Sequence, residues 1–275
     1  EPIADMNRKG CISVNDQAAG QHATPSPIIL ETRNLKKDFK GFTAINNVNV
    51  KVETGSIHAL IGPNGAGKTT FFNLLTQFLK PSAGQIIYDG NDITHSRPAG
   101  IAQQGLIRSF QISAVFPHLS ARENVRIALQ RTLGVSYQFW RSKRVLDQLN
   151  EEAQSTLELV ELGRSADTKA VELPYGQKRA LEIATTIALK PRLMLLDEPT
   201  QGMSAEDVGT VTDLIRRVVK GRTIVMVEHN LNVVATLADT ITVLNRGEVL
   251  AEGDYDTVST NPAVMEAYMG TTDAA

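Results

Sequence analysis

One eight-residue segment constrains this chain more than any other feature of its sequence. It fits the pattern G-x-x-x-x-G-K-[ST] and consists of Gly62, Pro63, Asn64, Gly65, Ala66, Gly67, Lys68 and Thr69. A strand-like run, Ile57 to Ile61, precedes it, and a helix is expected from Lys68 to Leu79. Glycines let backbone N–H groups approach a phosphate, and the positive end of a helix favours an anion. The segment therefore predicts a phosphate-binding loop within an α/β fold that has a mostly parallel sheet.

Phosphate binding, Mg²⁺ binding and activation of water are predicted from the last two residues of this loop and from a second, acidic segment at Asp197 and Glu198. Lys68 is expected to reach the β- and γ-phosphates of a nucleotide, and the Thr69 hydroxyl to bind Mg²⁺. A buried strand is expected from Arg192 to Leu196, and it places Asp197 and Glu198 at its carboxyl end, where α/β sheets bind ligands. Asp197 is then expected to hold Mg²⁺, directly or through water, and Glu198 to act as general base for the attacking water.

Helices and further strands alternate along the rest of the chain. β-branched residues predict a strand from Thr223 to Val227. Three- to four-residue apolar spacing predicts a helix from Arg144 to Leu162, with Gly163 placed to end it. Two more helices have recognisable starts, a Ser204 cap with Asp207 and the pair Asn261-Pro262.

Composition excludes several classes of protein. The 275 residues carry 28 Lys and Arg against 30 Asp and Glu, a net charge of −2, so a general nucleic-acid binder is not expected. No apolar run approaches the ~18 residues that a membrane span needs. The single cysteine, Cys11, excludes an internal disulfide and suits a reducing cytoplasm. Residues 1–27 are polar and rich in small side chains, and we expect a mobile extension there.

Three further features, the segment 173–177, Gln111 and His229, join the loop and the acidic strand in a pattern known from one protein family. Leu173-Pro174-Tyr175-Gly176-Gln177 precedes a helix expected from Lys178 to Leu189, just before the acidic strand. Together with the loop, Gln111, Asp197-Glu198-Pro199-Thr200 and His229, it resembles the ATP-binding subunit of ABC transporters, in order and in approximate spacing, over about 28–270. The resemblance implies a P-loop NTPase core with a mostly parallel sheet, an antiparallel β subdomain and a helical subdomain inserted at about 112–178, followed by a tail at 271–275.

The resemblance also implies roles for residues that are uninformative alone. Phe39 matches the aromatic that stacks on adenine, although it could be an ordinary core residue. Gln111 matches the residue that touches Mg²⁺ or the attacking water, and His229 the one that contacts the γ-phosphate. ATP is expected to be cradled by residues 62–69 with Thr70, and to be completed by Tyr175, Gly176 and Gln177 of a second subunit, because a polyanion is stabilised at a helix N-terminus.

Two residues depart from the family pattern, but neither is among the residues expected to bind Mg²⁺ or to activate the attacking water. Pro174 stands where the signature usually has serine, so one hydroxyl contact to the γ-phosphate is expected to be missing. Ser204 stands where the loop after Glu198 usually carries aspartate, which leaves signalling between subunits at this point open. Hydrolysis is expected to survive these changes.

Other segments indicate a branch of the family. Tyr175, Arg108-Ser109-Phe110-Gln111, Leu181-Glu182-Ile183-Ala184 and the terminal 261–270 segment resemble the ATPase of branched-chain amino-acid importers, in particular the member of its two-ATPase pair with a tyrosine in the signature. Relatives in that branch serve urea, amides and aromatic acids, so the resemblance leaves the solute open. Its implied partners are two permease subunits, a second ATPase (a copy or a paralogue) and, indirectly, a solute-binding protein. The implied location is cytoplasmic, on the inner face of the cell membrane.

Alternatives remain at this stage. The motifs do not separate import from export of a lipid or polysaccharide. A soluble mechanical ATPase acting on DNA or ribosomes is disfavoured, because only 108 positions separate Lys68 from Gly176 and the chain holds one phosphate loop. The run Ala114-Val115-Phe116-Pro117-His118-Leu119 resembles the surface that receives a coupling helix of the permease, but plain core packing explains it equally well.

Overall fold

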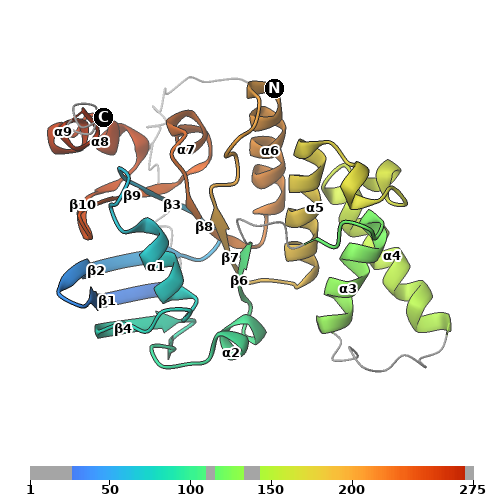
Figure 1. Cartoon of the computed structure of the whole chain (residues 1–275), viewed down its shortest axis with the longest axis horizontal. Helices are drawn as coiled ribbons and strands as arrows, with labels where there is room; N and C mark the ends of the chain where they lie inside the picture. The colour runs from blue at the N-terminus through green and yellow to red at the C-terminus, as the bar shows by residue number, and fades with distance from the viewer. Residues whose placement is uncertain (1–26, 110–114, 133–142, 270–275) are drawn as a thin grey trace, which may run out of the picture.

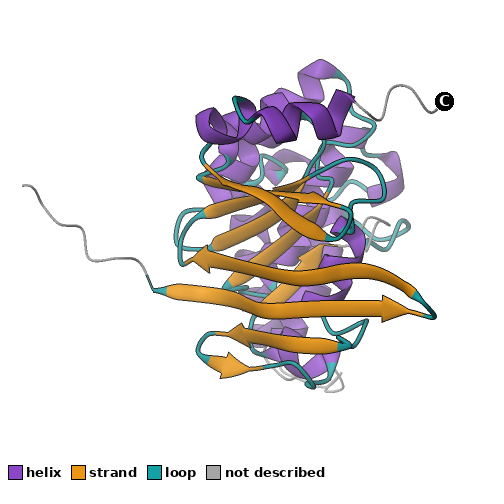
Figure 2. Ribbon diagram, turned by 90° about the vertical axis from the view of Figure 1, so that its left-hand side faces the viewer, coloured by secondary structure: helices purple, strands orange, loops and turns teal. Residues whose placement is uncertain are grey.

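Two stacked β-sheets with helices around them form the molecule (Figure 2). The computed structural model describes residues 27–109, 115–132 and 143–269. The first sheet is antiparallel, in the order β2-β1-β4-β5, with strands β1 (Ile28–Phe39), β2 (Phe42–Glu53), β4 (Ala83–Tyr88) and β5 (Asn91–Asp92). The second has the order β10-β9-β3-β8-β7-β6, with strands β3 (Ile57–Ile61), β6 (Leu106–Ser109), β7 (Leu193–Asp197), β8 (Thr223–Val227), β9 (Thr240–Asn245) and β10 (Glu248–Gly253).

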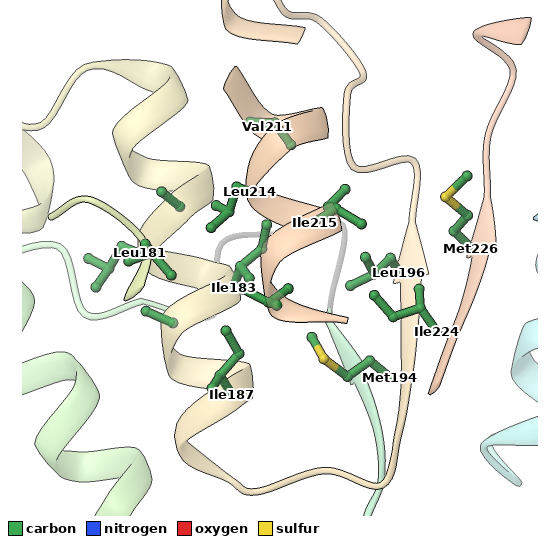
Figure 3. Packing of buried hydrophobic residues seen from close by; sticks show 14 of the residues in the cluster. Leu181, Ile183, Ile187, Met194, Leu196, Val211, Leu214, Ile215, Ile224 and Met226 are labelled. Atoms are coloured by element: carbon green, nitrogen blue, oxygen red, sulfur yellow. The ribbon is translucent and has the colours of Figure 1, made fainter. Parts of the chain in front are cut away.

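The second sheet is parallel from β6 to β9, and only β10 runs against its neighbour. Strands β3, β7 and β8 are buried at every position, as expected when both faces of a parallel sheet are covered. Alternate residues of β7 enter different cores: Met194 and Leu196 pack with helices, whereas Leu193 and Leu195 face the antiparallel sheet. Figure 3 shows the helical side of this packing, where side chains of β7 and β8 meet those of the helices at Tyr175–Ala188 and Ala205–Val218.

Helices divide between the two faces. Helix α1 (Lys68–Leu75) buries Phe71, Phe72, Leu74 and Leu75 in the core that it shares with the antiparallel sheet. Helices α3 (Ala121–Thr132), α4 (Lys143–Leu159) and α5 (Tyr175–Ala188) gather on the side of the molecule away from that sheet (Figure 1). The helices after α1 are α2 (Pro98–Gln103), α3 (Ala121–Thr132), α4 (Lys143–Leu159), α5 (Tyr175–Ala188), α6 (Ala205–Val218), α7 (Leu231–Leu237), α8 (Tyr255–Ser259) and α9 (Pro262–Met269), and single turns span Gly163–Ser165 and Ala170–Glu172.

This architecture confirms the predicted fold class, an NTPase-type parallel sheet with an antiparallel β portion and a helical portion. The strands expected at 57–61 and 223–227 have those bounds, and the strand expected at 192–196 lies at 193–197. Both predicted caps are present: Ser204 Oγ accepts the Asp207 N–H at 3.3 Å, and Asn261 Oδ1 accepts the Ala263 N–H at 2.9 Å. The boundaries of the helical subdomain, and the extent of the N-terminal extension and tail, stay predictions.

Three helices were predicted with wrong boundaries. Helix α1 ends at Leu75, not Leu79, because Gln77 adopts a left-handed φ of 59°. Helix α4 ends at Leu159, before Gly163, because Glu161 takes the left-handed position (φ 60°) and the Leu162 N–H donates to the Leu157 carbonyl at 2.8 Å. Helix α5 begins at Tyr175 and ends at Ala188, so it includes the end of the segment that was expected to precede it.

In the described part of the chain, no helix combines the length and the apolar character needed to cross a lipid bilayer.

Candidate active site

The loop between β3 and α1 has a backbone that only its glycines permit. Gly62, Gly65 and Gly67 have φ values of 148°, 79° and 105°. A Cβ at Gly62 would lie 2.1 Å from the Leu244 carbonyl oxygen of β9, and one at Gly67 would lie 2.8 Å from the Ala44 carbonyl oxygen. Asn64 and Gly65 at the loop's crest are exposed, and a Cβ at Gly65 would meet nothing within 4 Å. Both ends of the loop therefore pack closely against neighbouring backbone, whereas its centre is exposed to solvent. This shape suits a loop that binds phosphate through its backbone N–H groups.

Lys68 lies at the mouth of this cradle. Its ammonium donates to the carbonyl oxygens of Gly62 at 2.6 Å and Pro63 at 3.1 Å. Burial lowers the pKa of Lys68, and the charges of Glu198 and Asp197 oppose that shift. Strands β3 and β7 both run parallel to β8, so the loop after β3 and the two acids, Asp197 at the end of β7 and Glu198 just after it, lie at the same edge of the sheet.

Asp197 is buried at the carboxyl end of β7 and forms an ion pair. Arg108 of β6 donates through Nη2 to Asp197 Oδ2 at 2.5 Å and through Nη1 to Asn73 Oδ1 of α1 at 2.6 Å. The side chains of Arg108 and Asp197 are 10% and 5% exposed. Sequence reasoning quoted Arg108 only as a mark of the branch and missed this contact. A buried acid needs a partner, and that requirement was the available signal.

Glu198 has the strained backbone that often accompanies a functional residue. Its φ of 46° is left-handed, an uncommon conformation for a residue other than glycine, asparagine or aspartate. Its Oε2 atom is buried and has no hydrogen-bond partner within the described residues. An unsatisfied carboxylate oxygen at this edge suits the acceptance of a proton from an attacking water.

The expected signature segment ends in an uncapped helix N-terminus. Helix α5 begins at Tyr175, and its N-cap residue Pro174 makes no side-chain cap. Tyr175 is 58% exposed, and its hydroxyl donates to the Gln201 carbonyl oxygen at 3.1 Å. Gln177 is exposed as well. N–H groups of a first helical turn without a cap are suited to receive an anion from outside.

A buried carboxylate that sequence reasoning missed joins two of the predicted site segments. Glu228 is fully buried between β8 and α7. Its Oε1 accepts the N–H and the hydroxyl of Thr200, at 3.0 and 2.6 Å, and its Oε2 accepts the N–H groups of His229 and Asn230, at 3.0 and 3.2 Å. Four donors keep one carboxylate fixed, so the loop after Glu198 and the segment that carries His229 are held together.

The remaining predicted residues have different outcomes. Phe39 is 41% exposed at the tip of the β1–β2 hairpin, with the Lys37 ammonium 5.0 Å from its ring centre, so it is not a core residue. His229 is exposed. Phe116 is also exposed, which makes core packing the wrong explanation for that residue. Gln111 and Ala114 lie outside the described residues, as does Phe110.

The donor set agrees with Mg²⁺. Thr69 is exposed at the start of α1, and Asp197 lies across from the loop, so a hydroxyl and a carboxylate oxygen are available. The described residues contain no group of three or more His, Cys, Asp or Glu side chains that could hold a metal ion by themselves. Such a sparse set is typical of Mg²⁺ bound together with nucleotide phosphates rather than in an all-protein cage.

The C-terminal helix also reaches the loop. Tyr268 of α9 packs against the helical core, and its hydroxyl is buried at the backbone of Gly62. Burial raises the pKa of Tyr268, and the neighbouring Gly62 backbone opposes the shift. The first glycine of the loop is therefore in contact with β9 on one side and with the C-terminal helix on another.

A groove of about 580 Å³ is lined in part by Arg108, the residue that pairs with Asp197. Its lining comes from α2, α3, α5, β6 and the end of α1, and includes Phe78, Arg108, Phe116, Ile127 and Glu182. Phe78, Phe116 and Ile127 are exposed apolar side chains, so the groove has the character of a docking surface.

Comparison with family models agrees with this geometry. The model described as "ABC transporter" matches residues 45–201, which includes the loop, the expected signature and the acidic strand. A second model, "Branched-chain amino acid ATP-binding cassette transporter", matches residues 248–274, which includes β10, α8 and α9.

The similarity to individual relatives extends over most of this chain. The high-affinity branched-chain amino acid transport ATP-binding protein BraF of Pseudomonas aeruginosa is 38% identical, over 88% of this chain and 98% of the relative. The corresponding LivG protein of Escherichia coli is 34% identical, over 88% and 98%. Among solved structures, the ADP conformation of the ABC transporter cassette MJ1267 has a TM-score of 0.79 at 28% identity, covering 89% of this chain and 100% of the other. A dimeric post-hydrolysis state of the cassette MJ0796, bound to ADP and Pi, has a TM-score of 0.69 at 26% identity, over 82% and 98%.

Proposed function

This chain belongs to the ABC transporter family, as an ATP-binding and ATP-hydrolysing subunit, and we propose that it powers uptake of branched-chain amino acids or related small hydrophobic or amide solutes. The match of residues 248–274 to the branched-chain cassette model carries the proposal, because that segment lies outside the general ATPase core. The names of the relatives support the same branch.

In the proposed cycle, residues 62–70 cradle the phosphates of ATP, and Lys68 neutralises the β- and γ-phosphates. Thr69, Asp197 and Gln111 would hold Mg²⁺, and the bound ion would neutralise charge on the phosphates. Glu198 accepts the proton of the attacking water, and His229 contacts the γ-phosphate. Phe39 stacks on adenine through its exposed ring.

Tyr175, Gly176 and Gln177 act on the ATP of a second subunit. The open first turn of α5 supports this role, because its N–H groups and dipole attract a γ-phosphate that arrives from another molecule. ATP then contributes contacts to both subunits and closes the pair, and loss of the γ-phosphate removes those contacts.

The proposed assembly contains two permease subunits, a second ATPase that is a copy or a paralogue, and indirectly a solute-binding protein, with no nucleic acid. The apolar groove beside α3 and α5 is the proposed seat for a cytoplasmic helix of a permease. Its exposed Phe116 and Ile127 offer the apolar contacts that such a helix needs, and the exposed Arg131 adds a charge for orientation. With a permease helix in this groove, the proposed location of the chain is the inner face of the cell membrane.

The test is a pull-down of the tagged chain from detergent-solubilised native membranes, followed by mass spectrometry. Two multi-span permeases and a second ATPase are expected. The matched control is a Phe116→Asp variant, which places a charge in the groove and is expected to lose the permeases while it still binds nucleotide. The solute is then identified by screening a solute-binding protein encoded with the permeases. Recovery of ribosomal proteins or DNA factors without a permease would refute the importer assignment.

A further inference from the structure

Arg108 occupies an unusual position between three elements of the site. It extends from the end of β6, pairs with Asp197 at the end of β7, and reaches Asn73 in α1. Its guanidinium carbon also lies 5.7 Å from the ring centre of Phe72, which is fully buried. A nearly buried arginine is costly unless it is paired, so these contacts fix the guanidinium in one place.

The two hydrogen-bonded partners of Arg108, Asn73 and Asp197, belong to two of the three segments that supply the proposed Mg²⁺ ligands. Asp197 is itself a proposed ligand, and Asn73 lies one helical turn after Thr69 in the same helix. The guanidinium is planar and rigid, so its two bonds set the separation of β7 from α1 at this point. The pair engages Asp197 through Oδ2, which orients the carboxylate relative to the loop.

We propose that Arg108 is a positioning residue for the Mg²⁺ site: it keeps the Asp197 carboxylate in one orientation and ties it to the helix that carries Thr69. The proposal rests on the proposed function in one respect, the assignment of Asp197 as a Mg²⁺ ligand. Groups that hydrogen-bond a metal ligand from behind commonly contribute 10- to 100-fold in metal affinity. Arg108 makes its contribution through Asp197, and it is not itself a catalytic residue.

The position of Arg108 gives the proposal a consequence for coupling. The same side chain lines the groove proposed to receive the permease. A helix seated there would lie against the residue that orients Asp197, so groove and metal site share one side chain.

The experiment measures Mn²⁺ affinity of the ADP-loaded chain by electron paramagnetic resonance, with Mn²⁺ in place of Mg²⁺ because both prefer octahedral oxygen ligands. Arg108→Met is expected to weaken Mn²⁺ binding about 10-fold or more, while ADP affinity in EDTA stays within about twofold. Arg108→Lys keeps the charge but cannot reach both partners with one fork, so a smaller loss in the same direction is expected.

The matched control is Arg192→Met. Arg192 pairs with Asp89 at the opposite end of β7, where both side chains are exposed, so its removal is expected to leave Mn²⁺ affinity unchanged. Should Arg108→Met fail to fold in a thermal melt, the lysine variant alone decides the question.

Unchanged or tighter Mn²⁺ binding in a folded Arg108 variant would overturn the proposal, since tighter binding would mean that the arginine competes with the cation. Asp197→Asn separates this failure from a failure of the proposed function. If Asp197→Asn weakens Mn²⁺ binding and the Arg108 variants do not, only the positioning role is wrong. If Asp197→Asn has no effect, the ligand assignment itself is wrong.

Discussion

Glu198 combines backbone strain with an unsatisfied oxygen. A left-handed φ at a glutamate costs on the order of 1–2 kcal/mol, and a buried carboxylate oxygen without a partner adds to that cost. Structures retain such features where function needs them. Stability and hydrolysis therefore place opposite demands on this position.

Replacing Glu198 should separate those two demands. Glu198→Gly is expected to raise the free energy of unfolding by about 1 kcal/mol, because glycine adopts φ 46° without strain, and to abolish steady-state hydrolysis. Glu198→Gln is the control: it also loses hydrolysis, keeps the strain, and should retain ATP in a long-lived dimer. Urea titration and phosphate release measure the two effects. Normal turnover in the glutamine variant would remove Glu198 as the base.

Glu228 is expected to matter for rate more than for nucleotide binding. In Glu228→Gln an amide NH₂ replaces one oxygen and faces two donors, either those of Thr200 or those of His229 and Asn230. Misplacement of His229 should lower kcat about 10- to 100-fold, with KM for ATP changed little. Steady-state kinetics tests this, and a variant whose KM rises while kcat is intact would contradict the positioning role.

His58 gives the fold an acid-sensitive residue. It is buried in β3, and burial lowers its pKa from 6.5 to about 4. Thr242 donates its hydroxyl proton to Glu252 at 2.6 Å, so the Thr242 oxygen accepts from His58 Nε2 at 2.8 Å, which fixes the neutral tautomer. Between pH 6.5 and 4 the unfolded chain binds a proton that the folded chain does not, so stability falls as pH falls through that window.

This linkage is expected to be worth about 3 kcal/mol in total, present in full above pH 6.5 and lost toward pH 4. His58→Gln cannot titrate and retains a donor for Thr242. The unfolding free energy of the native chain, measured relative to that of this variant, should therefore fall as the pH is lowered from 7 to 5. Denaturant titrations at several pH values measure it, and a constant difference would show that His58 does not titrate on unfolding.

At the scale of single elements, helix α1 holds the two sheets together. Phe72 is fully buried in the core between them, and Phe78 just beyond the helix is exposed. Phe72→Ala is expected to destabilise the chain by about 3–5 kcal/mol through lost burial and a cavity. Phe78→Ala, the same substitution on the surface, should change stability by less than about 1 kcal/mol. Equal losses in the two denaturant curves would contradict the assigned core.

The elements show where sequence reasoning succeeds. Strands β3 and β8 were predicted to the residue, because continuous β-branched and apolar runs need burial on both faces. Helix ends were predicted less well. At α4 the expected terminator was Gly163, but Glu161 takes the left-handed position two residues earlier, and its exposed side chain pairs with Arg217. Arg108 and Glu228 carry no local signal, because each acts on a site segment that is distant in the sequence: Asp197 lies 89 positions from Arg108, and Thr200 lies 28 positions from Glu228.

At the scale of the whole molecule, the phosphate loop and the start of α5 are proposed to be halves of different sites. Two chains must then pair head to tail, each giving its loop to one ATP and its signature to the other. The solved dimer of the cassette MJ0796 shows that a chain of this fold pairs in a state with ADP and Pi.

Complementation tests this arrangement. Lys68→Ala and Gly176→Asp should each abolish hydrolysis. The first loses the phosphate contact; the second adds a negative charge at the signature, where the new Cβ would also lie 2.7 Å from Asp207 Oδ1 of the same chain. Mixed in equal amounts, half of the dimers contain one intact composite site, so about a quarter of native activity is expected to return. No recovery from folded chains would contradict a site shared between copies, or show that a paralogue is the required partner.

The contact between Tyr268 and Gly62 makes the end of the chain a place to monitor the nucleotide site. Helix α9 continues one residue to Met269, which is two-thirds exposed, while the neighbouring tyrosine hydroxyl is buried at the loop. An environment-sensitive dye at position 269 would stand outside the site, yet next to a residue that touches its first glycine. Its emission should report loading of the loop during turnover.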